Sequence, residues 1–113
     1  MADEHLDREV LNALQEVMED EYPLLLDTFL ADSEERLNLL RHAGDATQLI
    51  GTAHSFKGSS SNMGAVRLAQ LCHQLEQTAK DQKMTDSRHL VCEIYREFAI
   101  VRPLFEAERN RAL

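Results

Sequence analysis

The chain has 113 residues and a formal net charge of −8 at pH 7, and 43% of its residues are hydrophobic but only 5% aromatic. This length fits a single domain, residues 1–113, whose core must be mostly aliphatic. The sequence contains no basic stripe, which argues against nucleic acid and against anionic membrane surfaces as partners.

Apolar residues recur at helical spacing from the N-terminal end onward. Asp7 is a suitable N-cap for a first helix. The apolar positions of this helix are Leu6, Val10, Leu14, Val17 and Met18. A second helix should begin near Pro23, which suits the first helical turn, and end at Gly44, which suits the C′ position where helices often end in a left-handed residue. Its inward positions are Leu26, Phe29, Leu30, Ser33, Leu37 and Leu40.

Three more helices follow in the second half of the chain. Asp45 and Gln48 have the spacing of a capping box, which predicts the start of a third helix, and a break is expected around residues 62–64. The inward positions of this helix are Leu49, Ala53, Phe56, Ser60 and Met63, and those of the fourth helix are Leu68, Leu71, Cys72 and Leu75. Residues 80–87 read as a loop and cap. The last helix contains Leu90, Val91, Ile94 and Phe98, and Pro103 should kink it or end it.

No segment shows the alternation of a β-strand, and the connections between the helices are short. Short connections place consecutive helices side by side and antiparallel. We therefore predict an all-α fold, an antiparallel up-and-down four-helix bundle with an additional N-terminal helix that covers part of it.

Helix geometry places His54 on the outer face of the third helix. At about 100° per residue, the apolar positions gather in one arc, and His54 lies about 140° from the centre of that arc. Lys57 and Gly58 lie one turn after the histidine, and Gly51 lies one turn before it. A glycine in a helix costs roughly 1 kcal/mol relative to alanine, and a solvent-facing position gives no packing reason for it. Without Cβ atoms at these positions, another protein surface can approach the imidazole closely.

This combination fits phosphoryl transfer. An exposed imidazole nitrogen can attack phosphorus and carry a phosphoryl group, and the ammonium group of Lys57 can offset the charge that the group adds. A surface histidine without such neighbours is usually a solvated residue, so the two glycines and the lysine are what favour a function for His54.

Two stretches together resemble the histidine-containing phosphotransfer (HPt) domains of multistep phosphorelays: AHSFKGSSSNMGA at residues 53–65 and LAQLCHQLE at residues 68–76. They are similar to the family patterns AH-x-x-KG-x-x-x-x-x-GA and L-x-x-L-C-x-x-LE. The resemblance covers roughly residues 20–80. It implies a four-helix bundle with the phosphorylated histidine on a middle helix.

The resemblance also implies roles for particular residues. His54 would accept a phosphoryl group from a receiver-domain aspartate of a hybrid sensor kinase and pass it to an aspartate of a response regulator. Lys57 matches the family lysine near the phosphoryl group, and Gly58 matches the glycine that leaves room for the imidazole. No ATP-binding motif is present, so a carrier without kinase activity and without a cofactor is expected. Because the chain starts at Met1 and ends near the bundle, we expect a stand-alone bacterial member of the family.

One position departs from the family. Some members carry a glutamine near the phosphohistidine on the following helix, and this chain has Glu76 there. A carboxylate that pointed at the phosphoryl group would repel it, so the expected site does not include Glu76.

The surface that meets a receiver domain is expected to include Ile50, Gly51 and Ser61, with the protein acting as a monomer. A second hypothesis is a non-catalytic four-helix module that binds receiver domains without transfer. The presence of both His54 and Lys57 favours the carrier.

Hydropathy and the spacing of the cysteines and histidines give expectations about cellular compartment and metal binding. No apolar run approaches the roughly 18 residues of a membrane span, so no membrane insertion is expected. Cys72 and Cys92 form no C-x-x-C pair and follow no secretory peptide, which indicates reduced thiols in the cytoplasm. Cys72 and His73 have no further ligands at zinc spacing, so no metal site is expected.

Overall fold

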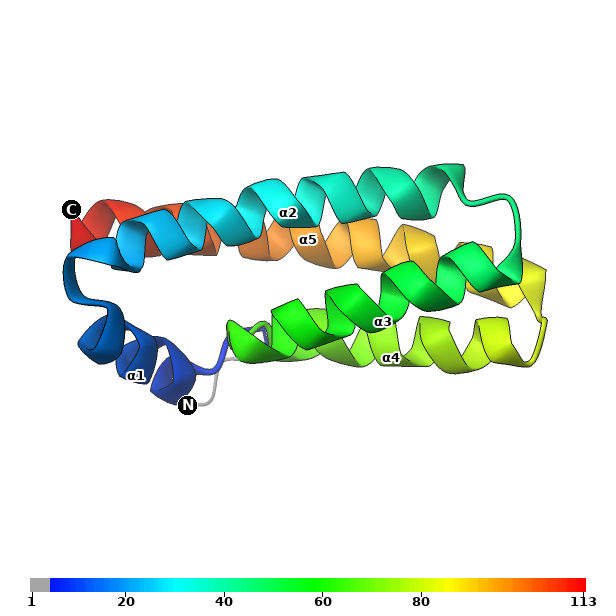
Figure 1. Ribbon diagram of the computed structural model, residues 1–113, viewed down its shortest axis with the longest axis horizontal. Helices are drawn as coiled ribbons and strands as arrows, with labels where there is room; N and C mark the ends of the chain where they lie inside the picture. Colours follow the sequence, from blue (N-terminus) through cyan, green and yellow to red (C-terminus); the bar gives the residue numbers. More distant parts are fainter. Residues whose placement is uncertain (1–4) are drawn as a thin grey trace.

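The computed structural model describes residues 5–113, and within this range all regular structure is helical. The helices are α1 (Arg8–Met18), α2 (Tyr22–His42), α3 (Ala46–Asn62), α4 (Val66–Lys80) and α5 (Met84–Ala112), with a short 3₁₀ turn (Glu19–Glu21) between α1 and α2. Helices α2 to α5 run up and down in turn, and each packs on two of the others (Figure 1). The predicted all-α, antiparallel four-helix bundle with an extra N-terminal helix is confirmed.

The inward stripes predicted for α2, α3 and α4 are all buried in the structure. They include two serines, Ser33 and Ser60, which are fully buried with the apolar residues. The four phenylalanines are also in the core, and the rings of Phe29 and Phe105 lie 5.0 Å apart between centroids. Helical periodicity therefore predicted the core faces of these three helices correctly.

In α1 the predicted stripe is partly wrong. Asp7 caps the helix as expected, since its side chain accepts hydrogen bonds from the backbone N–H groups of Glu9 and Val10. Leu11, which was not predicted to face inward, is fully buried, whereas Val17 is 78% exposed. The buried face of α1 is centred on Leu11, and at 100° per residue Val17 lies about 120° away from that centre.

Helix α1 occupies space at one end of the bundle. Helices α2 and α5 have 21 and 29 residues, whereas α3 and α4 have 17 and 15. The longer pair therefore extends beyond the shorter pair, and α1 lies in the space that this difference leaves (Figure 1).

The connection between α3 and α4 holds the N-terminal segment in place. The Asp7 backbone N–H donates to the Gly64 carbonyl at 2.7 Å, and the Val66 N–H donates to the His5 carbonyl at 3.1 Å. Gly64 has a φ of 74°, and a Cβ atom there would lie 3.1 Å from the Asp7 carbonyl oxygen. Only glycine suits both the backbone conformation and the close contact. The predicted break at residues 62–64 is therefore also the docking point of the N-terminal segment.

The end of α2 differs from the expectation. The helix ends at an extended Ala43, and Gly44 is not left-handed. Instead, the Gly44 N–H donates to Oε1 of Gln48 at 2.7 Å, while the Asp45 side chain accepts from the Gln48 N–H at 2.9 Å. The predicted capping by Asp45 is confirmed, but Gln48 turns back to Gly44 rather than to Asp45.

Helix α5 is longer than the sequence predicted. It begins at Met84, inside the expected loop at residues 80–87, and it continues through Pro103 to Ala112 instead of ending there. Val101 and Phe105, on either side of the proline, are fully buried, whereas Pro103 itself is exposed. Packing of these neighbours against the bundle outweighs the backbone hydrogen bond that Pro103 cannot make.

A buried carboxylate joins α5 to the N-terminal half of the chain. Glu108 is 3% exposed and accepts hydrogen bonds from Tyr22, Arg8 and Arg111 at 2.7–2.8 Å. Burial by itself raises the pKa of Glu108, but these three hydrogen bonds outweigh it and hold the pKa below its usual value. The carboxylate is therefore charged in the folded protein at neutral pH.

Replacing Glu108 should destabilise the fold. In Glu108→Ala, Tyr22 and Arg8 lose their buried acceptor, and we expect the free energy of unfolding to fall by about 3 kcal/mol. The exposed Glu93, also on α5, provides the control, since Glu93→Ala should change it by less than about 0.5 kcal/mol. Urea denaturation followed by circular dichroism measures both. Equal midpoints for the two variants would contradict the importance of this cluster.

Candidate functional site

His54 projects from the exposed face of α3. Its side chain is 68% exposed, while Leu49, Ala53 and Phe56 of the same helix face the core. The outward orientation that the helical wheel predicted is confirmed.

The imidazole of His54 is held from one side by α4. Its Nδ1 lies 3.2 Å from Oε2 of Glu76, and the other carboxylate oxygen, Oε1, accepts from Nζ of Lys57 at 2.9 Å. Nζ of Lys80, one turn after Glu76, lies 3.2 Å from Oε2. Glu76 therefore connects two side chains of α3 with one of α4.

The structure corrects the prediction about Glu76. We expected its charge to keep it out of the site, but its carboxylate is only 6% exposed and contacts both His54 and Lys57. It contacts the imidazole at Nδ1, and Lys57 and Lys80 offset its charge. The sequence contained a sign of this, because Lys80 follows Glu76 at i+4, a spacing at which opposite charges pair on a helix.

The ionisation of Glu76 determines which nitrogen of His54 carries the proton. Hydrogen bonding from Lys57 is the main cause that lowers the pKa of Glu76 to about 2; burial opposes it, and Lys80 adds to it. A charged carboxylate can only accept hydrogen bonds, so Nδ1 must be the protonated nitrogen. In a neutral ring this leaves a lone pair on Nε2, for which no hydrogen-bond partner is found within residues 5–113.

The two glycines leave the surface around His54 open. A Cβ atom added at Gly51 or at Gly58 would have no neighbour within 4 Å. Neither glycine is therefore required by packing, which agrees with the sequence interpretation. Both positions lie one turn from His54. Another protein can therefore approach the ring closely, because no side chain stands in the way at either position.

The predicted docking residues lie along the outer part of α3, on both sides of His54. Gly51 lines a hollow between α2 and α3, together with Arg36 and Ser55. Ser61 lines a hollow between α3 and α4, together with Lys57. Ile50 is half-buried and packs partly against the core. Gly51 and Ser61 therefore line two different hollows.

The arrangement provides one exposed nitrogen nucleophile, a carboxylate that orients it and two ammonium groups close by. Such a group can carry a transferred group in a covalent intermediate. Among residues 5–113, no three His, Cys, Asp or Glu side chains are placed to hold a metal ion. No helix in that part of the chain is both long and apolar enough to cross a membrane.

Comparisons with known proteins point to one family. Residues 24–102 match the family model of the Hpt domain. The crystal structure of histidine-containing phosphotransfer protein B (HptB) from Pseudomonas aeruginosa PAO1 is 58% identical, with a TM-score of 0.92 and 96% of each chain covered. The X-ray structure of a rice protein has the same fold, with 20% identity, a TM-score of 0.84, and 96% of this chain and 82% of the rice chain covered. Comparison with curated protein sequences gives no match.

The titration of Glu76 tests the geometry of the site. We expect its side-chain carboxyl to titrate with a pKa of about 2, and the pKa to move toward the usual 4.5 in Lys57→Ala, because that variant lacks the main hydrogen-bond donor. The folded-state pKa lies below the unfolded one, so the charged carboxylate stabilises the fold above about pH 4.5, and this contribution is lost as the pH falls toward 2. Carbon-detected NMR of the carboxyl groups measures the titration. A normal Glu76 pKa in the wild-type protein would show that the contact with Lys57 does not form.

Proposed function

The chain belongs to the family of histidine-containing phosphotransfer domains and is a phosphotransfer protein of a phosphorelay, and from this premise we propose that His54 carries the phosphoryl group. The donor is an aspartyl phosphate in the receiver domain of a hybrid sensor kinase, and the acceptor is an aspartate of a response regulator. The observation that supports this proposal most directly is the contact between Glu76 and Nδ1 of His54, which leaves Nε2 exposed with a free lone pair.

In the accepting step, the lone pair of Nε2 attacks the phosphorus atom of the aspartyl phosphate. The N–P bond forms, the bond between phosphorus and the acyl oxygen breaks, and the aspartate leaves as a carboxylate. As Nε2 gives up its lone pair, the ring becomes positively charged while Nδ1 keeps its proton. The Glu76 carboxylate, which accepts the Nδ1–H hydrogen bond, stabilises this positive charge. The donating step to the response regulator is the reverse of this reaction.

Lys57 and Lys80 balance the charges. At rest both ammonium groups contact Glu76, so the buried carboxylate is neutralised. Lys57 lies one turn from His54 on the same helix, and its flexible side chain can move to a phosphoryl oxygen on the imidazole. Lys80 then remains to offset the charge of Glu76.

The open surface of α3 fits the requirement that two different receiver domains reach the same nitrogen in turn. Gly51 and Gly58 allow this close approach, and Ile50 and Ser61 would contact the partner beside them. We propose that the protein acts as a monomer in the cytoplasm and has no kinase activity of its own. Receiver domains then supply and remove the phosphoryl group.

Transfer to His54 can be tested with a phosphorylated receiver domain. After incubation, wild-type protein should carry acid-labile, alkali-stable phosphate, and His54→Ala should carry none while it keeps its circular dichroism spectrum and urea midpoint. His89→Ala, an exposed histidine of α5, is the matched control and should accept phosphate as the wild type does. If the wild-type protein binds the receiver without accepting phosphate, the protein is the non-catalytic module instead.

Substitutions at Gly58 should separate stability from transfer. Gly58→Ala should raise the free energy of unfolding by roughly 0.5–1 kcal/mol, since alanine favours the helix and the added methyl group meets no neighbour. Both Gly58→Ala and Gly58→Leu should slow single-turnover transfer, the leucine more strongly, because they place bulk where the receiver approaches. Thr85→Leu, at an exposed position in the first turn of α5, controls for added apolar surface. Wild-type transfer rates in both Gly58 variants would show that the glycine does not provide access.

A further inference from the structure

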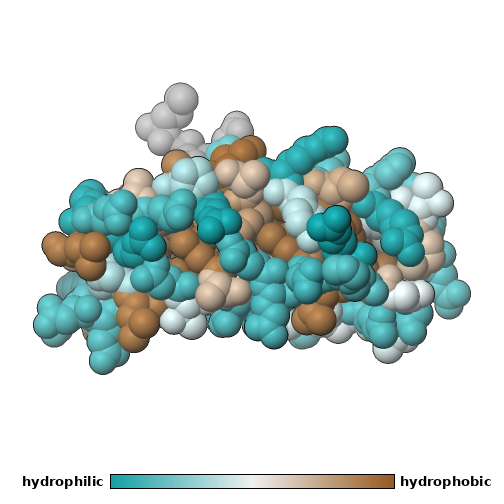
Figure 2. Space-filling model, turned by 90° about the horizontal axis from the view of Figure 1, so that it is seen from above, coloured by the Kyte–Doolittle hydropathy of each residue, from teal (hydrophilic) through white to brown (hydrophobic). Residues whose placement is uncertain are grey.

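A groove lies on the side of the bundle formed by α2 and α5, whereas His54 lies on the side where α3 meets α4. Its first part is a hollow of about 580 Å³ at the C-terminal end of α2, lined by apolar groups that include Leu40, Leu49 and Val91. Cys92 also lines it and is an exposed free thiol. Figure 2 views the molecule from above and shows apolar residues exposed between polar ones along the middle of that face.

A second hollow, of about 480 Å³, continues along the seam between α2 and α5. Both hollows are lined by Tyr95, whose hydroxyl donates to the Leu37 carbonyl at 2.9 Å and so fixes the ring between them. On α5 the lining extends from Arg88 to Arg102, which at 1.5 Å per residue is roughly 20 Å. This length fits an elongated occupant better than a compact small molecule.

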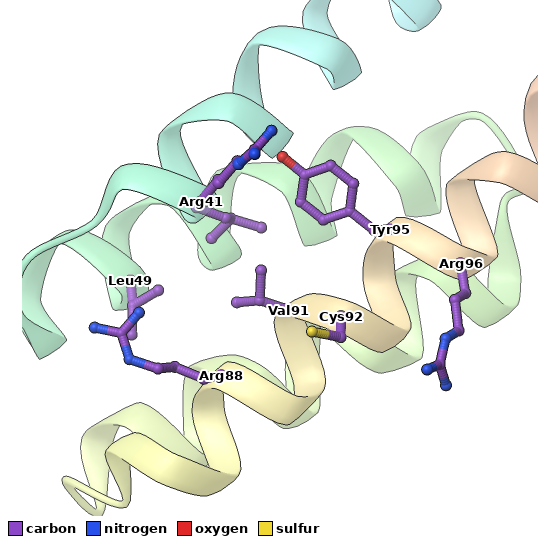
Figure 3. Close-up of a pocket in the computed structure, with 8 residues that line it drawn as sticks. Arg41, Leu49, Arg88, Val91, Cys92, Tyr95 and Arg96 are labelled. Carbon is purple, nitrogen blue, oxygen red and sulfur yellow. The ribbon is translucent and has the colours of Figure 1, made fainter.

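The margins of the first hollow are basic although the chain is acidic. It is lined by Arg41, Arg88 and Arg96, and none of them forms an ion pair within residues 5–113. Figure 3 shows Arg88 beside Leu49 and Arg41 toward Tyr95, with Val91 pointing between them. Arg96 extends away from the other side chains in the same view. The guanidinium groups of Arg41 and Arg88, which have no ion-pair partner, therefore lie on different sides of the apolar part of the hollow.

We propose that this groove binds an amphipathic acidic helix of a partner protein. Its aliphatic side chains would lie over Leu49 and Val91, and carboxylates on either side of them would pair with Arg41 and Arg88. The charges of the first hollow decide between an acidic and a basic occupant, because carboxylates complement its unpaired arginines whereas a basic helix would be repelled there. In the second hollow the Glu34 carboxylate already pairs with Arg102. Binding here leaves the His54 surface free, so the partner can be bound during phosphoryl transfer.

The test uses a synthetic helix and the native thiol. The probe is a fluorescent, lactam-bridged peptide of about 14 residues, which spans the groove, with leucines on one face and glutamates along its margins. A second peptide has lysines in place of the glutamates. Fluorescence anisotropy should show saturable binding of the acidic peptide only. Bound peptide should also slow alkylation of Cys92 by iodoacetamide, and Cys72 does not interfere because it is buried.

Arginine variants identify the site. The double variant Arg41→Ala/Arg88→Ala should bind the acidic peptide with an affinity at least about fivefold lower, since two charge pairs at the margin of the groove are lost. The double variant should accept phosphate at the wild-type rate. Arg67→Ala, an arginine of α4 outside the groove, should bind the peptide as the wild type does.

Four results would overturn the proposal. These are no binding of the acidic peptide, equal binding of the two peptides, equal affinity of the double variant and Arg67→Ala, and unchanged Cys92 alkylation in the presence of saturating peptide. Sedimentation analysis covers a further alternative. Self-association of the wild type that the double variant lacks would mean that a second copy of this chain occupies the groove, and would also contradict the proposal.

Discussion

One oxygen of the Glu76 carboxylate accepts from Lys57, and the other contacts His54 and Lys80, while almost all of the group is removed from solvent. A buried carboxylate is costly unless it is paired, so these partners are needed for it to remain charged. Its charge in turn places the His54 proton on Nδ1 and leaves Nε2 exposed. The orientation of the nucleophile thus depends on the same contacts that keep Glu76 ionised.

The fold brings these residues together because α3 and α4 form an antiparallel pair joined by a tight connection. Gly64 permits that connection through its left-handed backbone, and its carbonyl also holds Asp7. The register of the pair places Glu76 opposite the turn that contains His54 and Lys57. Ala53 and Phe56, on the packed face of α3, are fully buried and fix in the core the helix that carries His54 and Lys57. Rigid helices therefore position the site, and the exposed side remains open.

Much of this could be predicted from the sequence, because helical periodicity depends on local spacing alone. The core faces of α2, α3 and α4 and the outward direction of His54 follow from it. The role of Glu76 could not be predicted in the same way, because it depends on the register between two helices, which brings together residues 22 positions apart in the chain. The sequence left open whether Pro103 kinks or ends the last helix, and the helix does not end there for a related reason: burial of Val101 and Phe105 in the bundle outweighs a local helix-breaking preference.

The most direct test of this account is the ¹⁵N NMR spectrum of the His54 imidazole before and after phosphorylation. The account predicts a ring protonated at Nδ1 with an unprotonated Nε2, and after transfer a phosphoryl group on Nε2 while Nδ1 keeps its proton. A resting ring protonated at Nε2, or a phosphoryl group on Nδ1, would contradict the claim that the Glu76 carboxylate orients the nucleophile.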